Sequence, residues 1–290
     1  MTDYPPPSKA LAARLRKLSS RKGREENQRF LVEGPHLVKE CLLSGLVPRN
    51  LILSDEASDS IRTELEQIFI IHKNISCWTL PHKEFISLCG TITPQGVLGE
   101  FDQPRQLSWD LFGEWQHPKL AQFTSEGVTP GGQPIRIVVL DSIQEPGNVG
   151  TAIRCSAGLG ANAIVLTCGC ADIWNPKSLR ASVGAIFRVP IWANIPHSTL
   201  EQRLQTLNST IWVADPRGKS IFECKVIPNP LILVLGNEAR GPGSGWSGMA
   251  GARTIGIPLS HGLESLNVGT ALAALLSAIS AIESGQGCNP

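Results

Sequence analysis

The sequence predicts an α/β protein of two domains, the second built on a parallel sheet covered on both faces. Segments with strand character and segments with helical periodicity alternate along the chain, which is typical of layered α/β folds. Two runs, residues 135–140 and 231–235, are apolar at almost every position, as in parallel strands buried on both faces. Prolines and glycines recur between residues 103 and 134 and indicate a linker, so we expect domains at residues 1–102 and 135–290.

The first domain is predicted to be a small layer of strands and helices. Residues 9–20, with Leu11, Leu15 and Leu18 on one side, predict a helix that ends within residues 19–23. Predicted strands follow at residues 29–33, 50–54, 75–80 and 97–101, with predicted helices at residues 35–43, 55–68 and 81–89. A turn-rich loop, residues 91–96, leads into the last of these strands.

The start of the chain is strongly basic, although the formal net charge of the whole protein is +1. Residues 1–24 hold seven lysines and arginines against Asp3 alone, a local charge of +6 that leaves −5 for the remainder. Such a segment is an electrostatic site for a polyanion, with a solvated helix face as the equally weighted alternative. The candidate residues for binding a polyanion are Arg14, Arg16, Lys17, Arg21, Lys22 and Arg24.

The second domain continues the alternation. Predicted strands lie at residues 135–140, 163–166, 187–192, 210–214, 231–235 and 254–258, and predicted helices at residues 148–157, 176–185, 200–207 and from Val268 onward. Apolar residues of the last helix, such as Leu272 and Leu276, fall at helical spacing, and Ser265 is its expected N-cap. Because parallel strands place their carboxyl ends at one edge of a sheet, we expect the chemistry at that edge.

Composition argues against several classes of protein. The chain is 42% hydrophobic and 18% charged, as globular proteins are, and it shows neither an apolar run that could span a membrane nor a signal-peptide core. Its eight cysteines are scattered, which favours free thiols, a cytoplasmic protein and the absence of a metal site. Residues 158–163 match a dinucleotide-binding spacing but follow a helix and precede a strand, so we discard that match.

Three polar loops follow apolar strands and hold side chains without an evident structural task. They are residues 144–150, 236–241 and 264–267. The first loop opens a helix that carries Arg154 further along. Each loop alone is ordinary turn and cap chemistry. At the carboxyl ends of one sheet, however, three such loops would converge on a single pocket, and this convergence favours a functional site.

These loops resemble the three ordered motifs of a known enzyme family. EPGNVG at residues 145–150 with Arg154, LGNEARG at 235–241, and IPLS at 257–260 followed by SLNV at 265–268 are similar to the motifs of the SpoU (TrmH-like) RNA 2′-O-ribose methyltransferases of the SPOUT superfamily. The likeness covers the whole second domain. In the first domain, residues 21–24, 30–34 and 93–96 resemble, more weakly, an RNA-binding domain similar to ribosomal protein L30e.

The resemblance implies a deep trefoil knot, a homodimer formed through the knotted domain, and S-adenosyl-L-methionine as cofactor. It also implies methylation of a ribose 2′-hydroxyl in ribosomal or transfer RNA. By position, the cofactor contacts are Leu235, Gly236, Ile257, Leu259 and Leu266, and the catalytic set is Asn148, Arg154, Glu238, Ser265 and Asn267. Two alternatives stay open: a SPOUT enzyme that methylates a base, and a non-catalytic RNA-binding protein with a degenerate SPOUT domain.

Overall fold

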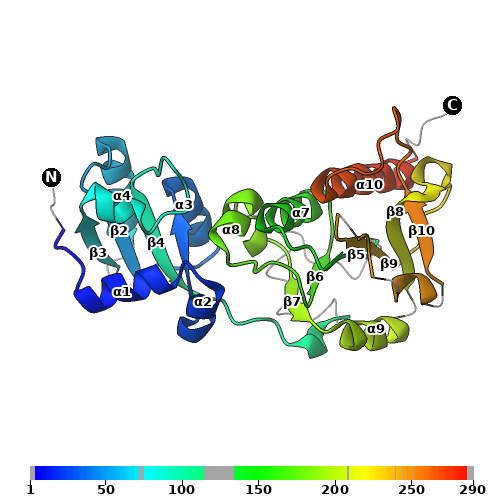
Figure 1. Cartoon of the computed structure of the whole chain (residues 1–290), viewed down its shortest axis with the longest axis horizontal. Helices are drawn as coiled ribbons and strands as arrows, with labels where there is room; N and C mark the ends of the chain where they lie inside the picture. Colours follow the sequence, from blue (N-terminus) through cyan, green and yellow to red (C-terminus); the bar gives the residue numbers. More distant parts are fainter. Residues whose placement is uncertain are drawn as a thin grey trace. The chain divides into compact units, whose positions relative to one another are not determined.

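The computed structural model describes residues 4–71, 75–113, 134–207, 209–238, 240–243, 245–249 and 251–285. These residues form two compact units, coloured along the sequence in Figure 1. Unit 1 comprises Met1–Arg105 together with Trp174–Gly184, and unit 2 comprises Gln106–Ile173 and Ala185–Pro290. The segment Trp174–Gly184 thus groups with unit 1, although it lies in the second domain of the sequence. Residues 114–133 of the predicted linker lie outside the described residues.

Unit 1 contains a four-stranded mixed sheet. Its strands lie in the order β1 (Arg29–Glu33), β4 (Val97–Asp102), β2 (Asn50–Ser54) and β3 (Ser76–Leu80). Strand β4 is antiparallel to β1 and β2, while β2 is parallel to β3. The helices of this unit are α1 (Lys9–Lys17), α2 (Arg21–Asn27), α3 (Pro35–Leu43), α4 (Asp59–Ile71), α5 (His82–Ile86) and α8 (Pro176–Ser182). The smaller α/β domain expected at the start of the chain is therefore present.

Helix α1 packs its apolar side into the core of unit 1. Leu11, Leu15 and Leu18 are at most 7% exposed and cluster with buried leucines and isoleucines of the sheet. The expected end of this helix opens a second helix, α2, which is capped by Ser20 accepting a hydrogen bond of 3.1 Å from the amide of Gly23. The sequence pattern missed α2 because RKGREEN has no apolar periodicity, the signal on which helix prediction depends.

Unit 2 is built on a six-stranded sheet that is parallel throughout, as predicted. The strand order is β10 (Arg253–Gly256), β8 (Thr210–Ser220), β9 (Leu231–Gly236), β5 (Arg136–Asp141), β6 (Ala163–Thr167) and β7 (Ile191–Ile195). The central strands β5 and β9 are buried along nearly their whole length, which explains why both are unbroken apolar runs in the sequence. The deep trefoil knot stays a prediction.

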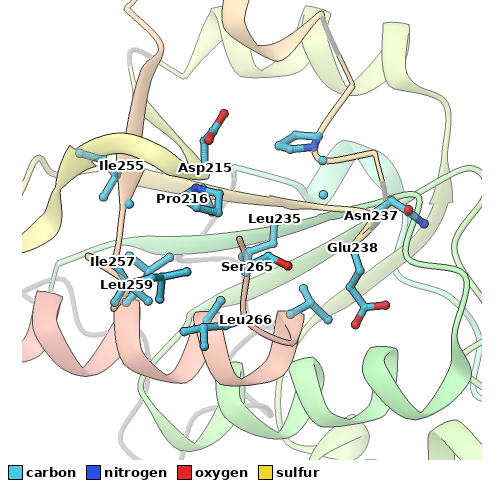
Figure 2. A pocket seen from close by; sticks show the side chains of 18 residues that line it. Asp215, Pro216, Leu235, Asn237, Glu238, Ile255, Ile257, Leu259, Ser265 and Leu266 are labelled. Atoms are coloured by element: carbon cyan, nitrogen blue, oxygen red, sulfur yellow. The ribbon is translucent and has the colours of Figure 1, made fainter. Parts of the chain in front are cut away.

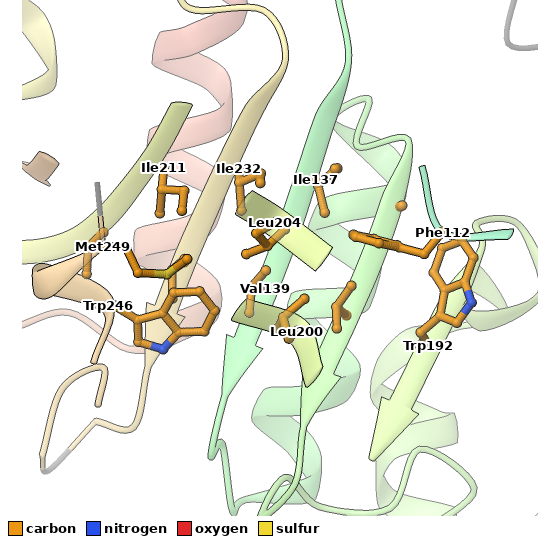
Figure 3. Close-up of a cluster of buried hydrophobic side chains, with 14 residues drawn as sticks. Phe112, Ile137, Val139, Trp192, Leu200, Leu204, Ile211, Ile232, Trp246 and Met249 are labelled. Carbon is orange, nitrogen blue, oxygen red and sulfur yellow. The ribbon is translucent and has the colours of Figure 1, made fainter. Parts of the chain in front are cut away.

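Different elements cover the two faces of this sheet. They are α7 (Pro146–Gly158), α9 (His197–Thr206), α10 (Val268–Glu283) and the short helices η1 (Trp109–Leu111), η2 (Ala185–Phe187), η3 (Ile221–Glu223) and η4 (Trp246–Gly248). Ile137 and Val139 of β5 point into a core shared with α9, Trp246 and Phe112, which Figure 3 shows. Side chains alternate along a strand, so Val138 faces the opposite side, where α7 and α10 pack against each other.

Some predicted elements of unit 2 are displaced. The strand expected at residues 187–192 is β7, Ile191–Ile195, because Pro190 has no amide hydrogen for the ladder and regular pairing with β6 begins only at Ile191. Strand β8 runs on to Ser220 instead of ending at residue 214, and β10 pairs with this extension.

None of the described helices combines the length and the apolarity that crossing a bilayer requires.

Candidate active site

Helix α7 begins directly after strand β5 and carries Asn148 in its first turn. Glu145 is the N-cap residue and accepts a hydrogen bond of 2.9 Å from the amide of Asn148. Pro146 occupies the first helical turn, where its missing amide hydrogen would have no partner in any case. The start of the helix therefore fixes Asn148 at the carboxyl end of β5.

Asn148 meets two side chains that lie 90 and 119 positions further along the chain, Glu238 and Asn267. The Asn267 side-chain nitrogen donates to Asn148 Oδ1 at 2.8 Å and to Glu238 Oε1 at 3.2 Å. The Asn148 side-chain nitrogen also donates to Glu238 Oε1. One carboxylate oxygen thus accepts from both amides, and the three sequence motifs meet through their side chains.

Helix α10 begins at Val268, as predicted, but its N-cap residue differs from the expected one. Asn267, not Ser265, is its N-cap, and Asn267 Oδ1 accepts a hydrogen bond of 2.9 Å from the amide of Gly269. A side chain at position 269 would clash, because a Cβ there would lie 2.5 Å from a methyl carbon of Thr151 on α7. Glycine at this position therefore lets the first turn of α10 approach α7 closely.

An apolar pocket lies next to this network, between the loop after β9 and the segment that leads into α10. Leu235, Gly236, Ile257, Leu259 and Leu266, the five predicted cofactor contacts, all line it, and Figure 2 shows the four apolar side chains around it. Glu238 and Ser265 also belong to its lining. Further lining residues that the sequence interpretation missed include Ala214, Asp215, Pro216, Ile255, Pro242, Val268, Ala271 and Leu275.

Asp215 brings a carboxylate to this pocket from β8. The hydrogen bond of 2.8 Å from the Arg217 amide to Asp215 Oδ1 holds the pKa of this carboxyl below its usual value, so it is ionised at neutral pH. Figure 2 shows the Asp215 and Glu238 carboxylates at separate points around the pocket. The signal that marks Asp215 in the sequence is the same as for the other loops, a polar turn, DPRG, directly after an apolar run.

Ser265 and Arg154 are placed differently from the other predicted catalytic residues. Ser265 is exposed beside Leu266 at the pocket. Arg154 is exposed on α7, six residues after Asn148. Six residues correspond to about 9 Å along a helix axis and to a different helix face. Among the described residues, Arg154 forms no hydrogen bond or ion pair, so this structure does not join it to the Asn148 network.

The basic residues of α1 and α2 divide into structural and exposed ones. Arg14 donates from Nε and Nη2 to the two carboxylate oxygens of Glu100 at 2.9 and 3.0 Å, and Glu100 is fully buried. Arg24 is 1% exposed, and its Nη1 donates to the backbone carbonyls of Leu18 and Ser19. The prediction of Arg24 as an RNA contact is therefore wrong, because this guanidinium is buried and joins α2 to the end of α1.

The remaining four basic candidates, Arg16, Lys17, Arg21 and Lys22, are exposed. Arg21 and Lys22 pair with Glu25 and Glu26 one turn further along α2, at 2.7 and 3.8 Å. Exposed pairs of this kind contribute at most about 1 kcal/mol and are screened by salt. Breaking these two ion pairs therefore costs little free energy.

Comparisons with known proteins connect both units to RNA methylation. The sequence model of the SpoU rRNA Methylase family matches residues 135–277, and that of an MRM3-like substrate binding domain matches residues 13–99. The 23S rRNA (guanosine(2553)-2′-O)-methyltransferase RlmP of Bacillus subtilis is 29% identical over 264 residues, which cover 90% of this chain and 92% of that protein.

Two further similar proteins differ in how much of their own length this chain covers. The mouse protein named rRNA methyltransferase 3, mitochondrial, is 30% identical over 216 residues, 73% of this chain and 46% of the mouse protein. The chain thus spans about half the length of this curated relative. A TrmH-family protein from Porphyromonas gingivalis has a solved structure that superimposes with a TM-score of 0.73 at 28% identity, over 94% of this chain and 98% of that one.

Proposed function

Because this chain belongs to the SpoU rRNA methylase family, we propose that it transfers a methyl group from S-adenosyl-L-methionine to a ribose 2′-hydroxyl of structured RNA. Ribosomal RNA is the substrate class that the names of the relatives favour. The observation that carries the proposal is the meeting of Asn148, Glu238 and Asn267 beside a pocket that all five predicted cofactor residues line. Methyl donor and methyl acceptor would then occupy adjoining sites.

The chemistry of the pocket fits the proposed cofactor. S-adenosyl-L-methionine supplies, when bound, a reactive methyl group on a positively charged sulfur, and it also carries a flat adenine ring. Leu235, Ile257 and Leu266 provide the apolar walls that such a ring prefers. The carboxylates of Asp215 and Glu238 place negative charge beside the pocket, which favours a cationic ligand over an anionic one.

The polar network is proposed to orient the ribose hydroxyl. Glu238 Oε1 accepts hydrogen bonds from Asn148 and Asn267, which fixes the direction of both amides and of the carboxylate. Glu238 Oε2 has no hydrogen-bond partner among the described residues, so it is open to a hydroxyl group of the substrate. Groups that are already in place lower a barrier because they need no reorganisation when charge develops on the reacting oxygen.

Arg154 is proposed as a phosphate ligand next to the reacting ribose. A guanidinium group stays protonated in proteins and is therefore poorly suited to remove a proton. It does bind phosphate through two parallel hydrogen bonds, which a lysine does not reproduce. The exposure of Arg154 and its lack of an ion-pair partner among the described residues support this role. Ser265, exposed beside the pocket, is proposed to complete the substrate site.

The proposed assembly is a homodimer formed through unit 2. Large apolar side chains are exposed on this unit, with Phe222 at 63%, Val226 at 79% and Leu263 at 62%. Exposed apolar groups of this size favour contact with another protein surface. Sedimentation equilibrium tests this assembly, and a monomer at all protein concentrations would contradict it.

A pair of matched variants tests the cofactor pocket. Ile257→Arg places a long cation in the pocket and should weaken binding of S-adenosyl-L-methionine by at least about tenfold, because a cationic ligand is repelled and the apolar wall is lost. Ile92→Arg makes the same chemical change in unit 1, at a side chain that is 95% exposed and absent from the pocket lining, so its affinity should equal that of the unchanged protein. Isothermal calorimetry measures both, and equal affinities for the two variants would refute the assignment.

A further inference from the structure

A second cavity lies on the other side of the loop that carries Glu238. It encloses about 590 Å³ and is lined by Ser142, Gln144, Cys168, His197, Asn237 and Arg240, among others. We call it the polar crevice. Asn237, Gly241 and Pro242 line both this crevice and the cofactor pocket, so the loop after β9 forms a thin wall between them.

Two hydrogen bonds hold described parts of this wall. The Asn237 side-chain nitrogen donates to the backbone carbonyl of Ser142 at 3.1 Å, and the Gly241 amide donates to the carbonyl of Asn237 at 2.7 Å. The loop is therefore tied both to the end of β5 and to itself. A ligand in the crevice would lie next to the catalytic network without displacing the wall.

The topology of the sheet places the crevice where α/β proteins bind ligands. It opens at the carboxyl ends of β5, β6 and β9. The chain leaves β5 toward α7 on one face of the sheet, whereas it leaves β9 toward Trp246, which packs on the opposite face with α9. Neighbouring strands whose connections depart to opposite faces leave a gap between those connections, and this gap is the general ligand site of open parallel sheets.

Both oxygens of the buried carboxylate in the crevice, Asp141, already accept hydrogen bonds. Asp141 is 5% exposed and accepts hydrogen bonds from Thr167 Oγ1 at 2.8 Å, from the Gly243 amide at 2.9 Å and from Trp246 Nε1 at 2.8 Å. With its oxygens occupied, this carboxylate offers little to a ligand. It serves to hold the floor of the crevice together and does not make the crevice a cation site.

Other groups of the crevice lack partners and are open to a ligand. Among the described residues, neither the Gln144 side-chain amide nor the Arg240 guanidinium forms a hydrogen bond or an ion pair, and both side chains are exposed. The aromatic ring of His197 lines the crevice and packs at a steep angle on the buried Trp246, with ring centres 4.6 Å apart. A neutral amide, a cation and a flat ring together match a nucleobase with its phosphate.

We infer that the polar crevice binds an unstacked base of the RNA substrate through Gln144, while Arg240 binds a phosphate of the same strand. The inference rests on the proposed function. It gives a substrate-binding role to Gln144, which precedes the first motif, and to Arg240, a motif residue whose role the resemblance leaves unassigned. A base that leaves its stack offers hydrogen-bonding edges and a flat face, which an amide and an aromatic side of a cavity recognise. The crevice would thereby select the nucleotide that is brought to Glu238.

Two variants with matched controls test this inference in the full-length protein. Gln144→Leu should raise KM for unmodified ribosomal RNA transcribed in vitro by about tenfold, the effect of losing one or two hydrogen bonds, and should leave binding of S-adenosyl-L-methionine unchanged. Gln205→Leu makes the same change on the exposed side of α9, away from both cavities, and should alter neither quantity.

Arg240→Gln adds an independent readout. It should lower the dependence of log affinity on log salt concentration by about one unit, because one phosphate contact is lost. Arg253→Gln, an exposed arginine on β10 outside both cavities, should leave that slope unchanged. Thermal unfolding of all four variants shows whether each is folded. Both altered positions are exposed, so folding is expected in each case.

The outcomes separate this inference from the proposed function. If the unchanged protein methylates RNA and Gln144→Leu and Arg240→Gln methylate the same nucleotide with the same KM and the same salt dependence, the crevice inference is overturned and the proposed function stands. If the unchanged protein binds S-adenosyl-L-methionine but transfers no methyl group to ribosomal or transfer RNA, the proposed function fails and the inference fails with it.

Discussion

At the scale of single residues, Asn267 uses every hydrogen-bonding group of its side chain. Its Oδ1 caps α10 by accepting from the Gly269 amide, and its Nδ2 donates to Asn148 and Glu238. An amide has one acceptor and two donor hydrogens, whereas a hydroxyl or a carboxylate lacks at least one of these. The same side chain therefore starts the last helix and completes the polar network, and the two tasks can be separated by substitution.

Asn267→Asp should separate them. Aspartate caps a helix as well as asparagine does, so the free energy of unfolding should change by less than about 1 kcal/mol. The variant has no amide hydrogens for Asn148 and Glu238 and places a second carboxylate beside Glu238, so the methyl-transfer rate should fall by at least about a hundredfold. Urea unfolding and a radiolabelled methyl-transfer assay measure the two effects. A parallel loss of stability and activity would mean that the cap, not the network, is what the reaction needs.

The sequence was informative about residues whose environment is local. The positions expected to contact a cofactor come from the resemblance to the SpoU motifs. They lie at the end of β9 and between β10 and α10, and all five line one pocket. Arg24 could not be assigned in this way, because its burial depends on how α2 folds back on α1. Arg14 likewise looks like a free surface charge until β4 brings the buried Glu100 to it over 86 positions of sequence. Charge patterns alone do not reveal such distant partners.

At the scale of elements, Asp141 joins three segments at the end of β5. Burial by itself would raise the pKa of Asp141, but hydrogen bonds from the Gly243 amide, Thr167 and Trp246 outweigh burial and hold the pKa below its usual value. The carboxylate thereby links β5 to β6 and to the segment after the Glu238 loop.

Asp141→Asn should therefore destabilise unit 2 in a pH-dependent way. At pH 7 the variant should lose about 2 kcal/mol, because an amide cannot accept from all the donors that face the carboxylate. The folded pKa of Asp141 is lowered, so its contribution is complete above the unfolded value of about 3.9 and is lost as pH falls through the folded pKa. The stability difference between the two proteins should stay constant from pH 6 to about pH 4 and shrink between about pH 4 and pH 3.

Urea unfolding as a function of pH checks this expectation. Ser142→Ala serves as a control, since the Ser142 hydroxyl donates to Asp141 only at 3.3 Å and the carboxylate keeps its closer donors. A stability difference for Asp141→Asn that stays constant over this pH range would show that the carboxylate is not ionised in the folded protein.

Regular elements were predictable where one periodicity dominated. The buried strands β5 and β9 and the helix α10 follow from apolar runs and from helical spacing. The extension of β8 to Ser220 was not predictable, because residues 215–220 lack an apolar run and only the pairing of Lys219 and Ser220 with β10 ties their end into the sheet. The strand predicted at residues 187–192 was misplaced because the apolar run there begins inside the short helix η2.

At the scale of the whole molecule, we propose that residues 1–102 recognise RNA and residues 135–290 catalyse methyl transfer, joined by residues 103–134. Two observations refine this division. Phe112, within the proposed linker, is fully buried in the core of unit 2. Helix α8 groups with unit 1, where Arg180 pairs with Glu33 at 3.2 Å. Such long-range packing leaves no local signal in the sequence. Composition therefore predicts the linker, but it does not predict that Phe112 packs into unit 2 or that α8 groups with unit 1.

The exposed basic residues of unit 1 should govern the salt dependence of RNA binding. Replacing Arg16, Lys17 and Lys22 together by glutamine should reduce the slope of log affinity against log salt concentration by about 2, because up to three phosphate contacts are lost. Lys39→Gln, an exposed lysine on α3, should leave it unchanged. Fluorescence anisotropy with a ribosomal RNA fragment measures the slope. Equal slopes for the triple variant and the unchanged protein would show that these residues do not contact RNA and are only a solvated helix face.

The central claim is that the network of Asn148, Glu238 and Asn267 presents a ribose hydroxyl to a methyl donor held in the adjoining pocket. The most direct measurement incubates the protein with ribosomal RNA and S-adenosyl-L-methionine carrying an isotope-labelled methyl group, digests the RNA to nucleosides and locates the label by mass spectrometry. The label should appear on the ribose of one 2′-O-methylated nucleoside and should be strongly reduced with Glu238→Gln. A label on a base, or none at all, would contradict the claim.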